Sequence, residues 1–207
     1  TELEFIAGLC NKYDVLAITD EIYEHILYDG AQHLPIWKQA GMAERTIMVN
    51  SISKTYSVTG WRVGYVVASL EISNSIRKVH DFLTVGAPAP LQIAAANSIR
   101  RLVDYYSEIA VFYRQRRDFL HEVLTQAGFE CFMPYGAYYI MADIRSKGGE
   151  NDVDFAMYLT RDIGVAVVPG SSFFRAENPD SRNYIRFCFC KKMETLEAAA
   201  SRLRKMG

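Results

Sequence analysis

The sequence predicts an α/β fold for the first half of the chain and a smaller α+β domain for the second half. Residues 15–19 and 46–50 are apolar runs of the kind that form buried strands in a largely parallel sheet. Residues 63–68 form a third apolar run, and the connection before it, of about a dozen residues, is too short for a helical crossover. We therefore expect the third strand to lie antiparallel to the second.

The first residues predict a helix that leads directly into the first of these strands. Thr1 followed three positions later by Glu4 is a capping-box pattern, in which a hydroxyl and a carboxylate each satisfy a free backbone donor. Apolar side chains then recur at helical spacing through Ile6 and Leu9.

Apolar periodicity and turn residues place the other elements. In chain order we expect a short helix near 36–37, helices at 71–83 and from 91, a proline break between them at 86–90, a long helix at 106–127, strands at 129–133, 137–143, 165–168 and 184–190, and helices at 153–163 and 194–205. The long helix ends at Gly128 and is predicted to connect two domains, 1–105 and 128–207. The cleft between these domains is the expected ligand site.

Composition limits the classes of partner. The chain has 207 residues and a formal net charge of −1, so no basic surplus exists to attract nucleic acid or an anionic membrane. No targeting segment or apolar run of membrane-spanning length is evident in it. Three arginines at 114, 116 and 117 form a small basic cluster, which we expect to be a solvated helix face.

The four cysteines, at positions 10, 131, 188 and 190, have no spacing typical of a disulfide framework. Free thiols in a reducing compartment, the cytoplasm, are therefore expected. Cys188 and Cys190 alternate along one predicted strand, as small buried apolar residues do, and no further ligands are evident that would make them a metal site.

One lysine has unusual surroundings. Lys54 follows the strand 46–50 among small hydroxyl residues, so it lies beyond the end of a strand, where ligands bind in open α/β sheets. A lysine held near apolar groups loses its proton readily and can condense with an aldehyde. A plain surface-loop lysine is the alternative reading, and the neighbouring residues argue against it.

These neighbours could hold a phosphorylated, cationic ring. Ser51, Ser53 and Arg62 could bind a phosphate through hydroxyl donors and a guanidinium fork. Asp20, at the end of the first strand, could pair with a protonated ring nitrogen, and Tyr23 lies three residues beyond it.

Four sequence blocks together resemble the class I/II pyridoxal-phosphate-dependent aminotransferases. They are DEIY at 20–23, SISK at 51–54, GWRVGY at 60–65 and NYIRF at 183–187. The resemblance implies fold type I, with this chain supplying the C-terminal part of the large cofactor domain and a small α+β C-terminal domain. It also implies pyridoxal 5'-phosphate as a Schiff base on Lys54, with Lys54, Asp20 and Tyr23 as catalytic residues and no metal. Asp20, Tyr23, Ser51, Ser53 and Arg62 would hold the cofactor.

Arg186 is the candidate for substrate binding. It lies on the predicted strand 184–190, and if Ile185 and Phe187 face the core, the arginine faces the other side. An ion pair with a carboxylate of the same domain is the structural alternative. In the light of the resemblance, we expect Arg186 to bind the α-carboxylate of an amino acid or a 2-oxo acid.

The resemblance leaves two alternatives open. A β-eliminating lyase could use the same residues, and a fragment without the rest of the site would be non-catalytic. Aminotransferases of this family are about twice as long as this chain, and we find no counterpart of their glycine-rich phosphate loop or ring-stacking aromatic residue. We therefore interpret the chain as the C-terminal half of a longer protein that is homodimeric and acts on small molecules.

Overall fold

The computed structural model describes residues 1–101, 104–175 and 177–206. The chain forms two compact units, Thr1–Ser107 and Glu108–Gly207. This division falls near the start of the long helix, whereas the predicted division into 1–105, a connecting helix at 106–127, and 128–207 stays a prediction. No helix in the described ranges is both long and apolar enough to cross a membrane.

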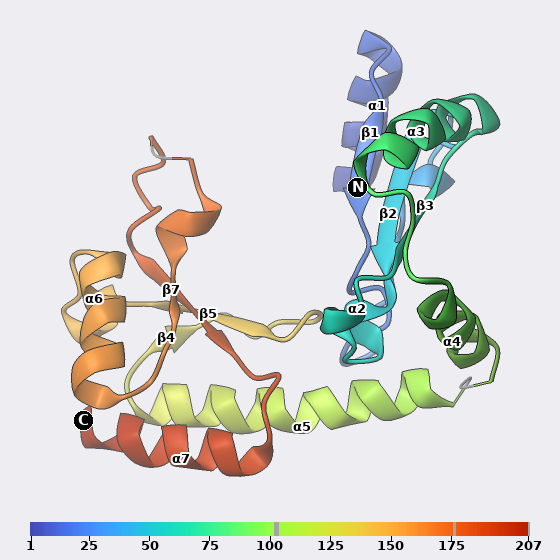
Figure 1. Cartoon of the computed structure of the whole chain (residues 1–207). Helices are drawn as coiled ribbons and strands as arrows, with labels where there is room; N and C mark the ends of the chain where they lie inside the picture. The colour runs from blue at the N-terminus through green and yellow to red at the C-terminus, as the bar shows by residue number, and fades with distance from the viewer. Residues whose placement is uncertain (102–103, 176, 207) are drawn as a thin grey trace. The chain divides into compact units, whose positions relative to one another are not determined.

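The first unit is an α/β structure built on a mixed sheet (Figure 1). Its elements are α1 Glu2–Tyr13, β1 Ala17–Asp20, β2 Thr46–Ser51, α2 Ile52–Thr55, β3 Gly64–Val67, α3 Leu70–Leu83 and α4 Ala89–Arg101. β1 pairs with β2 in parallel and β2 with β3 antiparallel, which confirms the predicted pairing of the third strand. The predicted short helix is the 3-10 turn Ile36–Lys38.

The capping box predicted at the start of α1 is present. Glu4 N–H donates to the Thr1 hydroxyl oxygen at 3.3 Å, and the Glu4 carboxylate accepts from the Thr1 amine. Behind α1, Ala7 and Cys10 pack in a small core with Met42. This core fixes the helix beside the loop that precedes β2.

The strands of the first unit are confirmed, but the prediction that 15–19 is buried is wrong for this chain. Leu16 and Ile18 are exposed, and so is every residue of β3. Apolar runs indicate strands that are covered on both faces, and the described residues leave part of this sheet uncovered.

The second unit consists of a sheet with strand order β4-β5-β7-β6 and its helices (Figure 1). Its elements are α5 Tyr105–Gln126, which begins just before the unit boundary, β4 Glu130–Cys131, β5 Tyr139–Asp143, α6 Asp152–Tyr158, β6 Val168–Pro169, β7 Tyr184–Cys188 and α7 Met193–Leu203. A π-helical turn, Leu159–Ile163, continues α6, and 3-10 turns lie at Thr59–Trp61 in the first unit and at Arg145–Lys147, Gly170–Phe173 and Arg204–Met206 in the second. All β pairs in this sheet are antiparallel.

Aromatic side chains join the helices of this unit to its sheet. On α5, the ring of Tyr113 lies 5.7 Å from that of Tyr138 and 6.5 Å from that of Phe189. The ring of Phe129 lies 5.7 Å from that of Phe187 on β7 and 6.2 Å from that of Phe155 on α6. One face of β7 is thus firmly packed.

The prediction that the arginine cluster is solvated is wrong for two of its members. Arg114 is exposed, but Arg116 and Arg117 are buried. Arg116 donates to the carbonyls of Phe112 and Lys191, and Arg117 donates to the Pro134 carbonyl and the Asp118 carboxylate. Their long apolar stems pack inside while backbone carbonyls accept the guanidinium hydrogens, which the charge pattern alone does not indicate.

Candidate functional site

The carboxyl ends of β1 and β2 lie next to each other and carry several predicted site residues. Parallel pairing sets Asp20, the last residue of β1, opposite Val49 on β2, and β2 ends two residues later at Ser51. Asp20 is exposed, and one of its carboxylate oxygens accepts a hydrogen bond from Ile22 N–H at 3.1 Å. The half-buried Tyr23 follows in the turn after β1. The sheet thus places Asp20, the predicted partner of the ring nitrogen, at the same edge from which the loop with Lys54 begins.

The two serines predicted to bind phosphate lie in direct contact. Ser51 Oγ lies 2.6 Å from Ser53 Oγ and donates to the Val63 carbonyl at 2.8 Å. Because Ser51 uses its own hydrogen on Val63, the hydroxyl of Ser53 is the donor between the two. Ser53 N–H also donates to Ser51 Oγ at 3.0 Å, so Ser51 caps the N-terminus of α2.

Lys54 lies in the short helix α2 and is half-buried. Among the described residues, its amine takes part in neither a hydrogen bond nor an ion pair. The helix itself is held in place, because Ile52 packs in a core with Val63 and with Ala95 of α4. Lys54 thus lies on a firmly packed helix, and its amine makes no polar contact with the described residues that stabilises the fold.

Arg62 is positioned by an unusual backbone conformation. Its φ is 56°, in the left-handed region that few residues other than glycine adopt, and it follows the 3-10 turn Thr59–Trp61. Its Nη1 donates to the Thr59 carbonyl at 3.1 Å, and the side chain is exposed. Arg62 adjoins Val63, whose carbonyl accepts from Ser51, so the chain returns to the serine pair at this point.

Gly64 permits the close approach of β3 to β2 at this edge. A Cβ at position 64 would lie 2.8 Å from the Asn50 carbonyl oxygen, closer than real side chains come to backbone. Any larger residue would push β3 away from Ser51 and move Arg62 with it.

A polar network beside the serine pair was not predicted from the sequence. The Glu24 carboxylate accepts from Asn50 Nδ2 at 2.6 Å and lies 3.4 Å from His25 Nε2. The hydrogen bond with His25 holds the pKa of Glu24 below its ordinary value. Asn50 directly precedes Ser51 and its side-chain oxygen accepts from Ser51 N–H at 2.6 Å, so Glu24 is linked to the serine through one side chain. The only sequence signal was the position of these residues next to predicted site residues.

Tyrosines complete this network. The hydroxyls of Tyr56 and Tyr106 lie 2.8 Å apart, and the ring of Tyr106 stacks on His25 at 4.0 Å. Burial and the Tyr106 hydroxyl raise the pKa of Tyr56, and burial with the Glu24 carboxylate raises the pKa of Tyr65 to about 12. These side chains line a cavity of about 110 Å³ together with Ser51. At neutral pH Tyr56 and Tyr65 are therefore neutral hydrogen-bonding groups.

Arg186, the predicted substrate residue, belongs to the second unit. Ile185 and Phe187 are buried on one face of β7, and Arg186 lies on the other face, as predicted. Its guanidinium carbon lies 4.0 Å from the ring centre of Tyr139 and 4.1 Å from that of Phe173. Both rings hold the planar group by cation–π contact.

The guanidinium of Arg186 pairs with no carboxylate in the part of the chain that the structure describes. Its Nε is buried without a hydrogen bond. The carboxylate of Asp143, on the neighbouring strand β5, binds Arg145, whose Nε lies 3.0 Å from each of its oxygens, and the bond from Arg145 holds the pKa of Asp143 below its ordinary value. The structural alternative, an internal ion pair for Arg186, is therefore absent from these residues. A buried cationic donor without a partner indicates a site for an anion.

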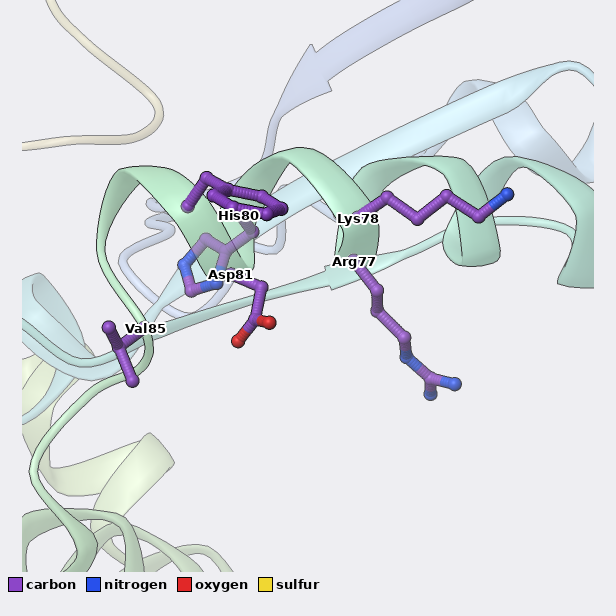
Figure 2. A pocket seen from close by; sticks show the side chains of 6 residues that line it. Arg77, Lys78, His80, Asp81 and Val85 are labelled. Carbon is purple, nitrogen blue, oxygen red and sulfur yellow. The ribbon is translucent and has the colours of Figure 1, made fainter.

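A second hollow, of about 520 Å³, lies along α3 (Figure 2). It is lined by Arg77, Lys78, His80, Asp81, Phe82 and Val85. Figure 2 shows Arg77 and Asp81 extending to the same side of the helix. All of these side chains are exposed, and among the described residues that line it there is no predicted site residue.

Comparison with known proteins assigns the chain to a family. The family model described as aminotransferase class I and II matches residues 1–203. Methionine aminotransferase of Escherichia coli is 39% identical over 94% of this chain and 50% of its own length, and kynurenine–oxoglutarate transaminase 1 of Rattus norvegicus is 35% identical over 99% and 53%. The solved N-succinyldiaminopimelate aminotransferase of Mycobacterium tuberculosis superposes with a TM-score of 0.96 at 34% identity, over 100% of this chain and 53% of that one. The chain thus spans about half the length of the relatives it matches, and it belongs to the class I and II aminotransferase family, with the α/β architecture of fold type I.

Proposed function

We propose that the protein is a pyridoxal-phosphate-dependent aminotransferase, which moves an amino group between an amino acid and a 2-oxo acid. The observation that carries this proposal is the pairing of a partnerless lysine amine on α2 with the Ser51–Ser53 hydroxyl pair beside it. The relatives named for methionine and kynurenine transamination support the same reaction class.

The residues present fit the cofactor. Lys54 would hold it covalently through Nζ. Ser51 and Ser53, whose hydroxyls are in contact, would bind its phosphate together with Arg62, which directly precedes the residue whose carbonyl accepts from Ser51. Asp20 would hold the ring nitrogen and Tyr23 the phenolic oxygen, both at the end of β1. When bound, the cofactor supplies an electron sink that stabilises negative charge at the substrate Cα.

The protein groups then have separate tasks. The negative charge of Asp20 would favour a protonated ring nitrogen, which the electron sink requires. The Lys54 amine would act as the base that removes the proton from the substrate Cα and as the acid that returns it. Rigid packing of α2 through Ile52 holds the amine in position for both transfers.

Arg186 would bind the α-carboxylate of the substrate. Its buried Nε needs a partner, and a carboxylate can accept from two nitrogens of a guanidinium at once. The rings of Tyr139 and Phe173 restrict the guanidinium to one plane and so lower the entropy that binding would cost.

We further propose that the complete protein is a cytoplasmic homodimer in which residues outside this chain cover the exposed apolar side of the first unit. The free thiols of all four cysteines support a reducing location. The side chains of Phe82 and Val85, 93% and 81% exposed, support an additional covering surface.

A panel of amino acids tests the function directly. Complete protein is mixed with pyridoxal phosphate and single amino acids, and the cofactor absorbance and the keto-acid product are followed. A change in the cofactor absorbance with an amino acid, reversed when a 2-oxo acid is added, supports transamination. Release of ammonia and pyruvate from sulfur amino acids, without amino transfer to a 2-oxo acid, would favour the β-eliminating lyase and contradict the proposal.

A further inference from the structure

The half-buried face of β7 carries Cys188 in line with Arg186, and Cys190 follows just beyond the end of the strand. Side chains alternate along an extended chain, so positions 186 and 188 share one face, while Ile185 and Phe187 are buried on the other. The prediction that Cys188 and Cys190 are small buried residues is therefore wrong, because both residues are partly exposed.

The two sulfur atoms are in direct contact. Cys188 Sγ lies 3.0 Å from Cys190 Sγ. β7 ends at Cys188, and Lys191 N–H donates to the Phe189 carbonyl at 2.8 Å, which makes a tight turn centred on Cys190. The two thiols thus meet at the end of β7, where the backbone is no longer paired with a strand on each side.

The surrounding charges make one of the two thiols reactive. A hydrogen bond from Cys190 and the nearby cations of Lys191 and Arg186 lower the pKa of Cys188 to about 6. The pKa of Cys190 is raised because its proton is held in that same bond. At neutral pH the pair therefore holds one proton, with a nucleophilic thiolate beside a second thiol.

Cys131 offers an internal comparison in the same unit. It is also partly buried, but burial alone raises its pKa to about 12. Its thiol therefore stays protonated, and the two positions should differ strongly in reactivity.

We propose that Cys188 and Cys190 form a redox-active dithiol that closes to a disulfide by exchange with a small-molecule disulfide of the glutathione type. The Cys188 thiolate attacks one sulfur of the oxidant and expels the first glutathione thiolate. Cys190 then loses its proton to solvent, attacks the Cys188 sulfur and expels the second. Two protein thiols are oxidised, and one molecule of the disulfide is reduced to two thiols.

The backbone geometry permits this bond. Positions two apart in an extended chain lie about 6.6 Å from each other between Cα atoms. Disulfides form over Cα separations of about 4.4–6.8 Å, so the separation lies within the range. Both cysteines are partly exposed, so a reducing thiol can reach the bond, which suits a reversible modification.

Oxidation would also change the surroundings of Arg186. The Cys188 thiolate places a negative charge near the guanidinium, and the disulfide is neutral. The oxidised protein should therefore bind a carboxylate at Arg186 more tightly, by roughly two- to fivefold for a partly solvated charge. This consequence rests on the proposed function, whereas the dithiol itself does not.

Peptide mapping of the complete protein tests the dithiol. The protein is treated with oxidised glutathione at pH 7, free thiols are alkylated, and the protein is digested with trypsin, which places both cysteines in peptide 187–191. We expect this peptide to be two hydrogens lighter than its reduced form, with Cys131 alkylated. Cys190→Ser should instead retain glutathione on Cys188, and Cys131→Ser should behave as the unaltered protein. A stable glutathione adduct on unaltered Cys188, or equal reactivity of Cys131, would overturn the proposal.

Steady-state kinetics test the consequence for Arg186. The KM for an amino acid should fall roughly two- to fivefold on oxidation, and it should not respond to the oxidant in Cys188→Ser. An internal disulfide with an unchanged KM would refute the link to Arg186. An internal disulfide in a protein without any transaminase activity would refute the proposed function and leave the dithiol standing.

Discussion

The two compact units bury their apolar side chains to very different degrees. In the second unit, Ile140 and Ile185 of the sheet, Phe189 just after β7 and Leu124 of α5 are fully buried. In the first unit, β3 is exposed throughout and α3, although amphipathic, has no buried residue. A helix and a strand of this composition are stable only when another layer covers them.

Because of this difference, the residues proposed to form the site are held in place differently in the two units. Arg186 is held by its own sheet and by two aromatic rings, all within the second unit. Lys54, Asp20 and Arg62 lie on the first unit, where the local loop is packed but part of the sheet is not. We infer that the second unit can form its share of the site alone and that the first cannot. Variants in the first unit should then lower turnover, and variants in the second should change substrate affinity or stability.

The largest expected effect comes from removing the lysine amine. Lys54→Ala should lower kcat in the complete protein by about 10⁴-fold or more, because covalent attachment and proton transfer are lost together. Non-covalent cofactor binding should persist through the serine pair. Lys38→Ala, at an exposed lysine of the same unit, is the matched control and should keep near-normal turnover.

Asp20→Asn should have the next largest effect. The substitution keeps the shape but removes the negative charge, so the ring nitrogen would lose its proton and the electron sink would weaken. We expect turnover to fall about 10³-fold, or about 4 kcal/mol, measured as kcat with saturating cofactor. Asp14→Asn, just before β1, removes an exposed carboxylate and should have little effect. Normal turnover in Asp20→Asn would remove Asp20 from the mechanism.

The stability of the units gives the third prediction. Residues 108–207 expressed alone should unfold cooperatively in urea, whereas residues 1–107 should associate through their exposed apolar surface. Within the 108–207 fragment, Ile140→Ala should lower the free energy of unfolding by about 2–5 kcal/mol, since the side chain is fully buried. Val153→Ala, at an exposed position of α6, should change it by less than about 0.5 kcal/mol. A soluble, cooperatively folded 1–107 fragment would contradict the distinction between the units.

Arg186→Lys should have the smallest effect of the four. The positive charge remains, but the planar fork and its aromatic stacking are lost, so KM should rise by roughly 10- to 100-fold with a smaller change in kcat. Arg182→Lys, at an exposed arginine close in sequence, should leave both constants unchanged. A fall in kcat alone would place Arg186 in a different role.

Much of the fold could be predicted from the sequence because local signals agree there with the tertiary structure. The capping box at Thr1, the antiparallel β3 and the side-chain alternation around Arg186 each depend on short-range geometry. The sixth strand was placed too early, at 165–168 instead of Val168–Pro169, since valines favour a strand wherever they occur.

The parts that could not be predicted depend on contacts between distant residues. Glu24 reaches Asn50 across the sheet, and Tyr56 meets Tyr106 fifty positions later. The burial of Arg116 depends on the Lys191 carbonyl, which lies seventy-five positions away in sequence. The exposure of the sheet in the first unit could likewise not be predicted. An apolar run indicates a buried strand but does not show which residues cover that strand.

The most direct test of the account is to find which lysine carries the cofactor. Complete protein is incubated with pyridoxal phosphate, reduced with borohydride and digested with trypsin, and the labelled peptide is sequenced. Reduction blocks cleavage at the modified lysine, so we expect the label on Lys54 within an uncleaved peptide 46–62. Label on any other lysine, with Lys54 unmodified, would contradict the proposed site.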